Sequence, residues 1–147
     1  SDVNFNSTLC IYPNECYDCF DVLICGVGDL AHGGIVFQIN EDGTGLVADL
    51  QDLGLMDWYD AMDTAAISTS LGYDDWYLPS LEELELMYNT IGQGGLQDNI
   101  GGFQPGRYWS NLVYNPNGSA WRLRFSDGHA SSGSMSAENW VRLIRSF

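Results

Sequence analysis

The chain has 147 residues, of which 45% are hydrophobic and 17% are charged. This composition is typical of one globular domain and not of a disordered chain. Twenty acidic and five basic residues give a net charge of −15 at pH 7, which disfavours nucleic acid and anionic membranes as partners. No apolar run approaches the roughly 18 residues that span a bilayer, so membrane insertion is not expected.

The charges are distributed unevenly along the chain. All five basic residues lie after residue 100, and they are Arg107, Arg122, Arg124, Arg142 and Arg145. Of the acidic residues, only Asp127 and Glu138 lie in that same part. One interpretation is a solvated acidic surface on residues 1–100. The other is that the last third of the chain carries a surface with a different role.

Four cysteines cluster near the N-terminus, at Cys10, Cys16, Cys19 and Cys25. An even number of closely spaced cysteines in an acidic chain of extracellular type favours two disulfides. A tetrahedral zinc site is one alternative, because the spacing of Cys16 and Cys19 suits a metal, and free thiols are another. The sequence does not choose among the three pairings. We expect residues 1–32 to form a cysteine-rich segment that packs on a ligand-binding domain of residues 33–147.

Residues 33–91 contain the patterns of one hairpin and two helices. The β-branched run 33–40, an Asp-Gly turn at Asp42 and the run 46–48 together predict a β-hairpin. Between residues 56 and 71, apolar residues recur every three or four positions, which predicts an amphipathic helix. Ser80 and Glu83 have the spacing of a capping box, so a second helix should begin after Ser80.

A glycine-rich loop at 92–102 is followed by three short predicted strands, at 107–111, 120–126 and 140–145. Two helices followed by a run of strands predict an α+β fold. In the second strand, alternation places Arg122 and Arg124 on one face, opposite the apolar residues. The residues expected in the core are Trp76, Leu78, Leu84, Met87, Trp109, Trp121 and Leu143.

Residues suited to catalysis are scarce. Only His32 and His129 would titrate near neutral pH, and neither belongs to an HExxH motif or accompanies a G-x-S-x-G elbow. The adjacent carboxylates Asp74 and Asp75 fit a structural role better than a glycosidase pair. The sequence also lacks a P-loop, a dinucleotide fingerprint and an EF-hand. We therefore expect no enzyme, no catalytic residue, no metal site and no cofactor.

Several motifs follow one another in the order of a known family. They are Gly33-Gly34-Ile35-Val36-Phe37, Asp75-Trp76-Tyr77-Leu78-Pro79-Ser80, Gly106-Arg107-Tyr108-Trp109-Ser110 and Val141-Arg142-Leu143-Ile144-Arg145-Ser146-Phe147. In these motifs the chain resembles the Lcl-type C-terminal domain family, which occurs on bacterial, archaeal and phage surface proteins. The resemblance implies a C-type lectin-like fold, with two helices flanking a twisted antiparallel sheet and ligands bound by the later strands and loops. It implies neither carbohydrate nor calcium, because the Glu-Pro-Asn, Gln-Pro-Asp and Trp-Asn-Asp ligand motifs are absent.

The resemblance also extends to the variable proteins of diversity-generating retroelements, many of which end in such a domain. In those proteins the stretch from the Tyr-Trp-Ser motif to the chain end is diversified, while framework aromatic residues stay. Here the polar stretches 111–119 and 129–136 would vary, and the framework would be Trp109, Trp121, Phe125 and Val141. An ordinary surface domain that is not diversified is the alternative.

We expect a ligand-binding module displayed outside the cell, on a cell surface or a virion, with a protein or glycan receptor as its partner. The predicted binding face comprises Asn111, Leu112, Tyr114, Arg122, Arg124, Ser126, His129, Ser131, Ser132 and Ser134. Tyrosine and arginine supply rigid contact area, while serine and asparagine adapt. Arg122 and Arg124 either bind an acidic partner together or pair with carboxylates of their own chain. The alternatives in function are a calcium-assisted glycan-binding adhesin domain and a structural tip domain.

Overall fold

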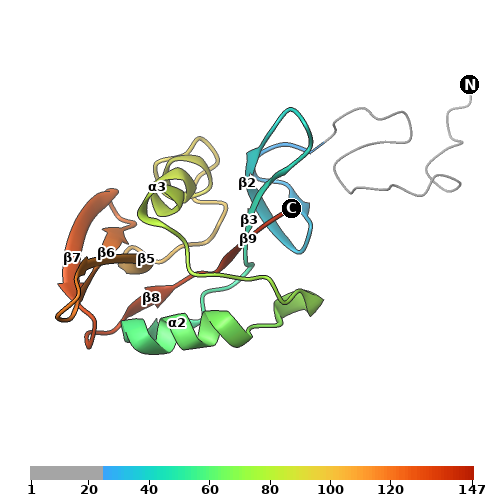
Figure 1. Cartoon of the computed structure of the whole chain (residues 1–147). Coiled ribbons are helices and arrows are strands. Elements are labelled where there is room, and N and C mark those ends of the chain that lie inside the picture. Colours follow the sequence, from blue (N-terminus) through green and yellow to red (C-terminus); the bar gives the residue numbers. More distant parts are fainter. Residues whose placement is uncertain (1–24) are drawn as a thin grey trace, which may run out of the picture.

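The computed structural model describes residues 25–147, which contain two α-helices and two β-sheets (Figure 1). This arrangement confirms the predicted α+β class. It differs from the expected single sheet, because the strands divide between a four-stranded and a five-stranded sheet. None of the helices in this part of the chain is long and apolar enough to cross a bilayer.

The four-stranded sheet joins the beginning of the described chain to its C-terminus (Figure 1). Its order is β1-β2-β3-β9, all antiparallel, with β1 (Leu30–Ala31), β2 (Gly34–Ile39), β3 (Gly45–Ala48) and β9 (Ile144–Ser146). Strands β2 and β3 are the predicted hairpin. The Asp42 carboxylate closes the turn by accepting hydrogen bonds from the N–H and the hydroxyl of Thr44.

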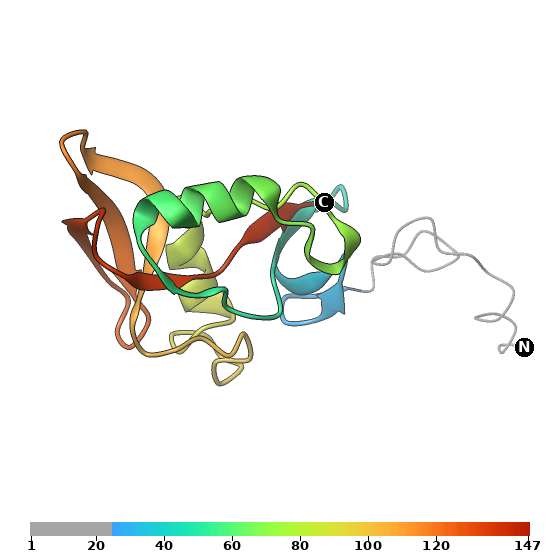
Figure 2. The same ribbon diagram turned by 90° about the horizontal axis from the view of Figure 1, so that it is seen from below.

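The five-stranded sheet carries the later strands. Its order is β4-β8-β5-β6-β7, with β4 (Gly54–Met56), β8 (Asn139–Val141), β5 (Arg107–Asn115), β6 (Ser119–Arg124) and β7 (His129–Ser134). Neighbouring strands are antiparallel except β5 and β8, which are parallel. Strands β5, β6 and β7 lie at one end of the molecule, shown in orange in Figure 2. We call these three strands the ribbon.

Both helices begin at capped N-termini. In α2 (Trp58–Ile67) the Asp57 carboxylate accepts a hydrogen bond from the Asp60 N–H. In α3 (Leu81–Thr90) the predicted capping box is present, because Ser80 Oγ accepts from the Glu83 N–H and the Glu83 carboxylate accepts from the Ser80 N–H. These caps satisfy backbone donors that the first turn of a helix leaves free.

The two helices cover different clusters of the core. Helix α3 packs Leu84 and Met87 against residues of both sheets, including Phe37 of β2 and Leu123 of β6. Helix α2 buries only the small side chains of Ala61 and Ala65 in a second cluster, against which its first residue, Trp58, packs half-buried. The large residues of that cluster are Trp76, Leu78, Trp109, Met135, Val141 and Leu143. The small alanines let α2 approach the bulky tryptophans closely.

The prediction that Trp121 lies in the core is wrong. The other six predicted core residues are buried, whereas Trp121 is half-buried and belongs to neither cluster described above. Leu123 and Phe125, on the same side of the chain, cluster with α3. Trp121 lies nearer the tip of the β5–β6 hairpin and packs against Tyr114. The alternation of side chains along β6 was therefore predicted correctly. The prediction that the core covers this strand as far as Trp121 was wrong.

The closing motif places a buried arginine between two loops. The Arg142 side chain is 2% exposed and its Nε lies 2.7 Å from the Asp52 carboxylate. Its guanidinium also donates to the carbonyls of Asp49, Gly101 and Gly102. One side chain thus links the loop at residues 49–52 and the loop at residues 101–102 to β8, whose last residue is Val141.

The second arginine of that motif has a similar role at the other end of the fold. Arg145 Nε lies 2.7 Å from the Asp75 carboxylate, and Nη1 donates to the carbonyl of His32. The guanidinium carbon lies 3.8 Å from the centre of the Tyr73 ring. The Arg145 hydrogen bond lowers the pKa of Asp75. Arg142 and Arg145 therefore both hold distant parts of the fold together.

Two predicted features of the C-terminal third are wrong. No strand is predicted between 126 and 140, but residues 129–134 form β7, which pairs with β6 in continuous register. The strand expected at 140–145 is two strands, β8 and β9, in different sheets. The chain changes sheet at Arg142 and Leu143.

The cysteine predictions fall mostly outside the described residues. Cys10, Cys16 and Cys19 lie there, while Cys25 begins the described part and is not a free thiol. The two disulfides therefore stay a prediction. Residues 27–31 pack on the domain, because Gln97 donates to the carbonyl of Val27 and β1 pairs with β2.

Candidate functional site

Strand β5 changes from buried to exposed halfway along its length. Tyr108, Trp109 and Ser110 are fully buried. Leu112, Val113 and Tyr114 are 43%, 41% and 58% exposed. Leu112 and Tyr114 point to one face of the strand and Val113 to the other, and exposed apolar patches often mark interaction sites.

A local irregularity produces this change. The Ser110 hydroxyl donates to the carbonyl of Trp121 and accepts from the N–H of Leu112, and the β5–β6 register shifts between Trp109 and Val113. The Asn111 N–H donates to the Pro79 carbonyl, and Asn111 has no paired residue in β6. Such bulges bend a strand and redirect its side chains. The second half of β5, from Asn111 onward, therefore extends away from the part of the sheet that the core buries.

The exposed half of the ribbon carries an aromatic patch on one face. Tyr114 contacts Trp121 edge to face, with ring centroids 5.2 Å apart. Register places Ser132 opposite Trp121, and alternation places Leu112 and Ser134 on the same side. We call Leu112, Tyr114, Trp121, Ser132 and Ser134 the aromatic patch. A rigid aromatic pair bordered by serines is typical of surfaces that bind proteins.

The opposite face of the ribbon is basic. Arg107 lies opposite Arg124, and Arg124 lies opposite His129. Arg122 and Ser131 form the next pair on the same face. We call these five residues the arginine face.

Within that face, Arg124 is already paired. Its Nε and Nη2 both donate to the Asp127 carboxylate across the turn that follows β6. This contact lowers the pKa of Asp127 to about 2. The expectation that the arginines pair within their own chain therefore holds for Arg124, through a carboxylate only three residues away.

Arg122 is held differently. Among residues 25–147 it has no carboxylate partner, and it donates two long hydrogen bonds of 3.4 Å, to Ser131 Oγ and Asn139 Oδ1. Its guanidinium lies against Gly133, where a Cβ would come within 2.6 Å of the guanidinium carbon. Burial, followed by the charge of Arg107, lowers the pKa of Arg122. Arg107 likewise has no carboxylate partner among these residues, so two cations without a carboxylate lie close together on the arginine face.

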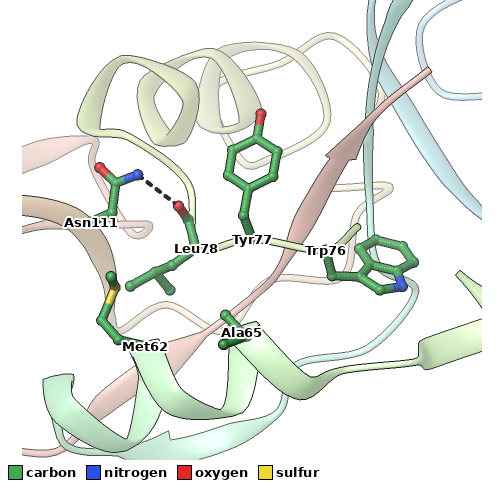
Figure 3. Close-up of a pocket in the computed structure, with 7 residues that line it drawn as sticks. Met62, Ala65, Trp76, Tyr77, Leu78 and Asn111 are labelled. Atoms are coloured by element: carbon green, nitrogen blue, oxygen red, sulfur yellow. Dashed lines mark hydrogen bonds between the residues drawn. The ribbon is translucent and has the colours of Figure 1, made fainter. Parts of the chain in front are cut away.

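An apolar hollow of about 210 Å³ lies between α2 and the segment before α3 (Figure 3). In Figure 3 the Asn111 amide turns to the Leu78 carbonyl, with a hydrogen bond of 3.0 Å. The hollow is smaller than the roughly 300 Å³ at which ligand pockets begin, and it has no charged side chain. Its lining residues are Met62, Ala65, Ala66, Trp76, Tyr77, Leu78 and Asn111. It is therefore the weaker candidate site.

The structure divides the predicted binding residues between two faces. Leu112, Tyr114, Ser132 and Ser134 belong to the aromatic patch, whereas Arg122, Arg124, His129 and Ser131 belong to the arginine face. Asn111 is committed to the backbone before α3, and Ser126 is exposed in the turn after β6. Sequence reasoning missed Arg107 and Asn139, and placed Trp121 in the core. The strand register brings all three into position, and no local motif indicates that register.

The described residues contain no group of three or more His, Cys, Asp or Glu side chains placed to hold a metal ion.

The ribbon lies within the region matched by a known family. The family model of the Lcl C-terminal domain matches residues 34–145. The chain belongs to the Lcl C-terminal domain family. The match runs from the first residue of β2 into β9 and confirms the family resemblance read from the motifs. No curated protein matches this Lcl C-terminal domain.

Proposed function

We propose that this Lcl C-terminal domain is a receptor-binding module with a C-type lectin-like fold, displayed outside the cell on a cell surface or a virion. Its contact surface is the aromatic patch of the ribbon, and its partner is a protein. The observation that carries the proposal is the exposure of Leu112 and Tyr114 on the face of the ribbon that holds Trp121. Burying such aromatic residues supplies most of the affinity in many interfaces.

The acidic surface of the rest of the chain supports this choice of contact surface. The 20 acidic and five basic residues leave the molecule strongly negative, whereas the patch itself consists of apolar and hydroxyl side chains. A protein partner meets little charge repulsion at the patch and avoids the acidic surface elsewhere.

The retroelement hypothesis belongs to the same proposal. The stretches 111–119 and 129–136 include the exposed positions of the ribbon, so those positions are able to vary without loss of the core, whereas Met135 is buried and would have to stay. Trp109, Phe125 and Val141 are buried and serve as framework. The encoding DNA tests this hypothesis, because a near-identical template copy that differs at adenines is expected beside the gene.

Binding to arrays of short peptides and of glycans tests the proposed function. Tyr114→Ser should weaken binding to the preferred peptide about 30-fold, the effect of a hot spot worth about 2 kcal/mol. Tyr59→Ser is the matched control, because Tyr59 is 53% exposed on α2, outside the patch. Equal losses in both variants, or calcium-dependent glycan binding in place of peptide binding, would refute the proposal.

A further inference from the structure

Arg107 and Arg122 form a pair of cations without carboxylate partners in the described part of the chain. Arg124, Arg142 and Arg145 each bind a carboxylate. The protein has 20 acidic residues, so a shortage of carboxylates does not explain the difference. Two like charges held on neighbouring strands repel each other, and a bound anion removes that repulsion.

Asn139 supplies a second, independent observation. Its side chain is buried, with the residue only 6% exposed, and its Oδ1 accepts from Arg122 Nη1. Its Nδ2 has no hydrogen-bond partner. Buried donors in native proteins are rarely left unsatisfied, and those that are often belong to a site for a missing acceptor. The unsatisfied amide and the unpaired guanidinium therefore adjoin each other.

We propose that Arg122, Arg107 and the Asn139 amide form a binding site for one carboxylate group, that of an aspartate or glutamate side chain of a protein partner. The two long hydrogen bonds of Arg122 are weak, so its guanidinium exchanges them for a carboxylate at little cost. A guanidinium matches a carboxylate with two parallel N–H donors. A carboxylate held by this guanidinium beside Asn139 also accepts from Nδ2, the donor that lacks a partner.

The net charge of the chain selects a single carboxylate over a polyanion. At −15 the molecule repels a sulfated glycan or a nucleic acid along most of its length. One carboxylate on an otherwise neutral segment meets the two arginines and little of the acidic surface. The site is on the opposite face of the ribbon from the aromatic patch, so the two are separable by mutation.

The first test is an NMR titration of the labelled chain with sodium acetate, compared with sodium chloride at equal ionic strength. Acetate should shift the Arg122 Nε–H and Asn139 side-chain amide resonances in a saturable way, and chloride should not. Arg122→Gln should abolish the shift at Asn139, and Arg124→Gln should leave it intact, since Arg124 is occupied by Asp127. The amide spectrum shows in each case that the variant is folded.

Gly133→Ala provides a variant that keeps both charges. Its methyl group would lie within 2.6 Å of the Arg122 guanidinium and push it aside. Acetate affinity should fall several-fold while the fold persists. Unchanged acetate affinity would mean that the position of the Arg122 guanidinium does not affect binding, and this result would contradict the proposed carboxylate site.

The second test uses paired short peptides that differ only by glutamate or glutamine. Arg122→Gln should reduce binding of the glutamate peptides about tenfold and leave the glutamine peptides unchanged. Absence of an acetate-specific shift overturns the site whatever the peptides do, and so does preferential binding of a sulfated glycan at Arg122. An intact acetate shift together with no effect of Tyr114→Ser on peptide binding would instead count against the aromatic patch alone.

Discussion

Replacement of Arg142 by methionine tests the buried network that joins β8 to the two loops. Methionine has a similar length but no charge and no donor. The change leaves the Asp52 carboxylate, whose side chain is 11% exposed, with the Tyr108 hydroxyl as a donor but no cation. It also removes the donors to the carbonyls of Asp49 and Gly101. The variant therefore has an uncompensated buried charge and two buried acceptors that have lost a donor.

Removing one partner of a buried ion pair costs about 3–5 kcal/mol. For a chain of this length that loss lowers Tm by about 10–20 °C. Urea unfolding followed by tryptophan fluorescence gives the free energy, and circular dichroism gives Tm. Arg124→Gln is the control, and it should change both far less because exposed ion pairs contribute little. The reasoning is refuted if Arg142→Met costs less than about 1 kcal/mol.

Three further predictions concern a helix cap, two tryptophans and one carboxyl group. Ser80→Ala should lower the free energy of unfolding by about 1 kcal/mol in a urea titration, because α3 loses its N-terminal acceptor. Trp109→Ala should cost about 3–5 kcal/mol and Trp121→Ala less than half of that, since only Trp109 is fully buried; equal losses would contradict a surface role for Trp121. The Asp127 carboxyl should titrate by NMR with a pKa of about 2, and Arg124→Gln should raise that pKa. Because the folded pKa is depressed, the stabilisation is present above the unfolded value of about 4 and is lost as the pH falls through about 2; an unchanged pKa in Arg124→Gln would contradict the pairing.

Local signals predicted the first half of the fold well. The turn at Asp42 and the capping box of Ser80 and Glu83 involve residues two or three positions apart, so the sequence alone contains the whole interaction. The burial of Trp109 was also predicted, although Tyr108 and Ser110 on either side of it are buried too, so packing and not alternation accounts for it. Structure that depends on neighbours in the chain is therefore readable from sequence.

Strand β7 was missed because its own residues do not favour a strand. His129–Ser134 contains serine, alanine and glycine, and no β-branched or aromatic side chain. Its six residues are ordered by pairing with β6, a tertiary effect. The division of 140–145 at Arg142 has a similar origin, because each part joins a different sheet.

The candidate site was predicted only in part for the same reason. Alternation correctly placed Arg122 and Arg124 on one face, but it does not tell which of them is paired. Asp127 lies three residues after Arg124 and was a readable signal for that pair. Asn139 is 17 positions from Arg122, and only the sheet order brings them together. How far the helices cover the sheet also depends on tertiary packing, and Trp121 lies beyond the covered part.

Hydrogen–deuterium exchange on the complex with the tightest-binding array peptide tests the central claim, that the ribbon is the binding surface. Amides in 111–124 and 129–134 should gain protection, while those of α2 and of strands β1, β2 and β3 should stay unchanged. Added protection confined to α2 or to the four-stranded sheet would contradict it.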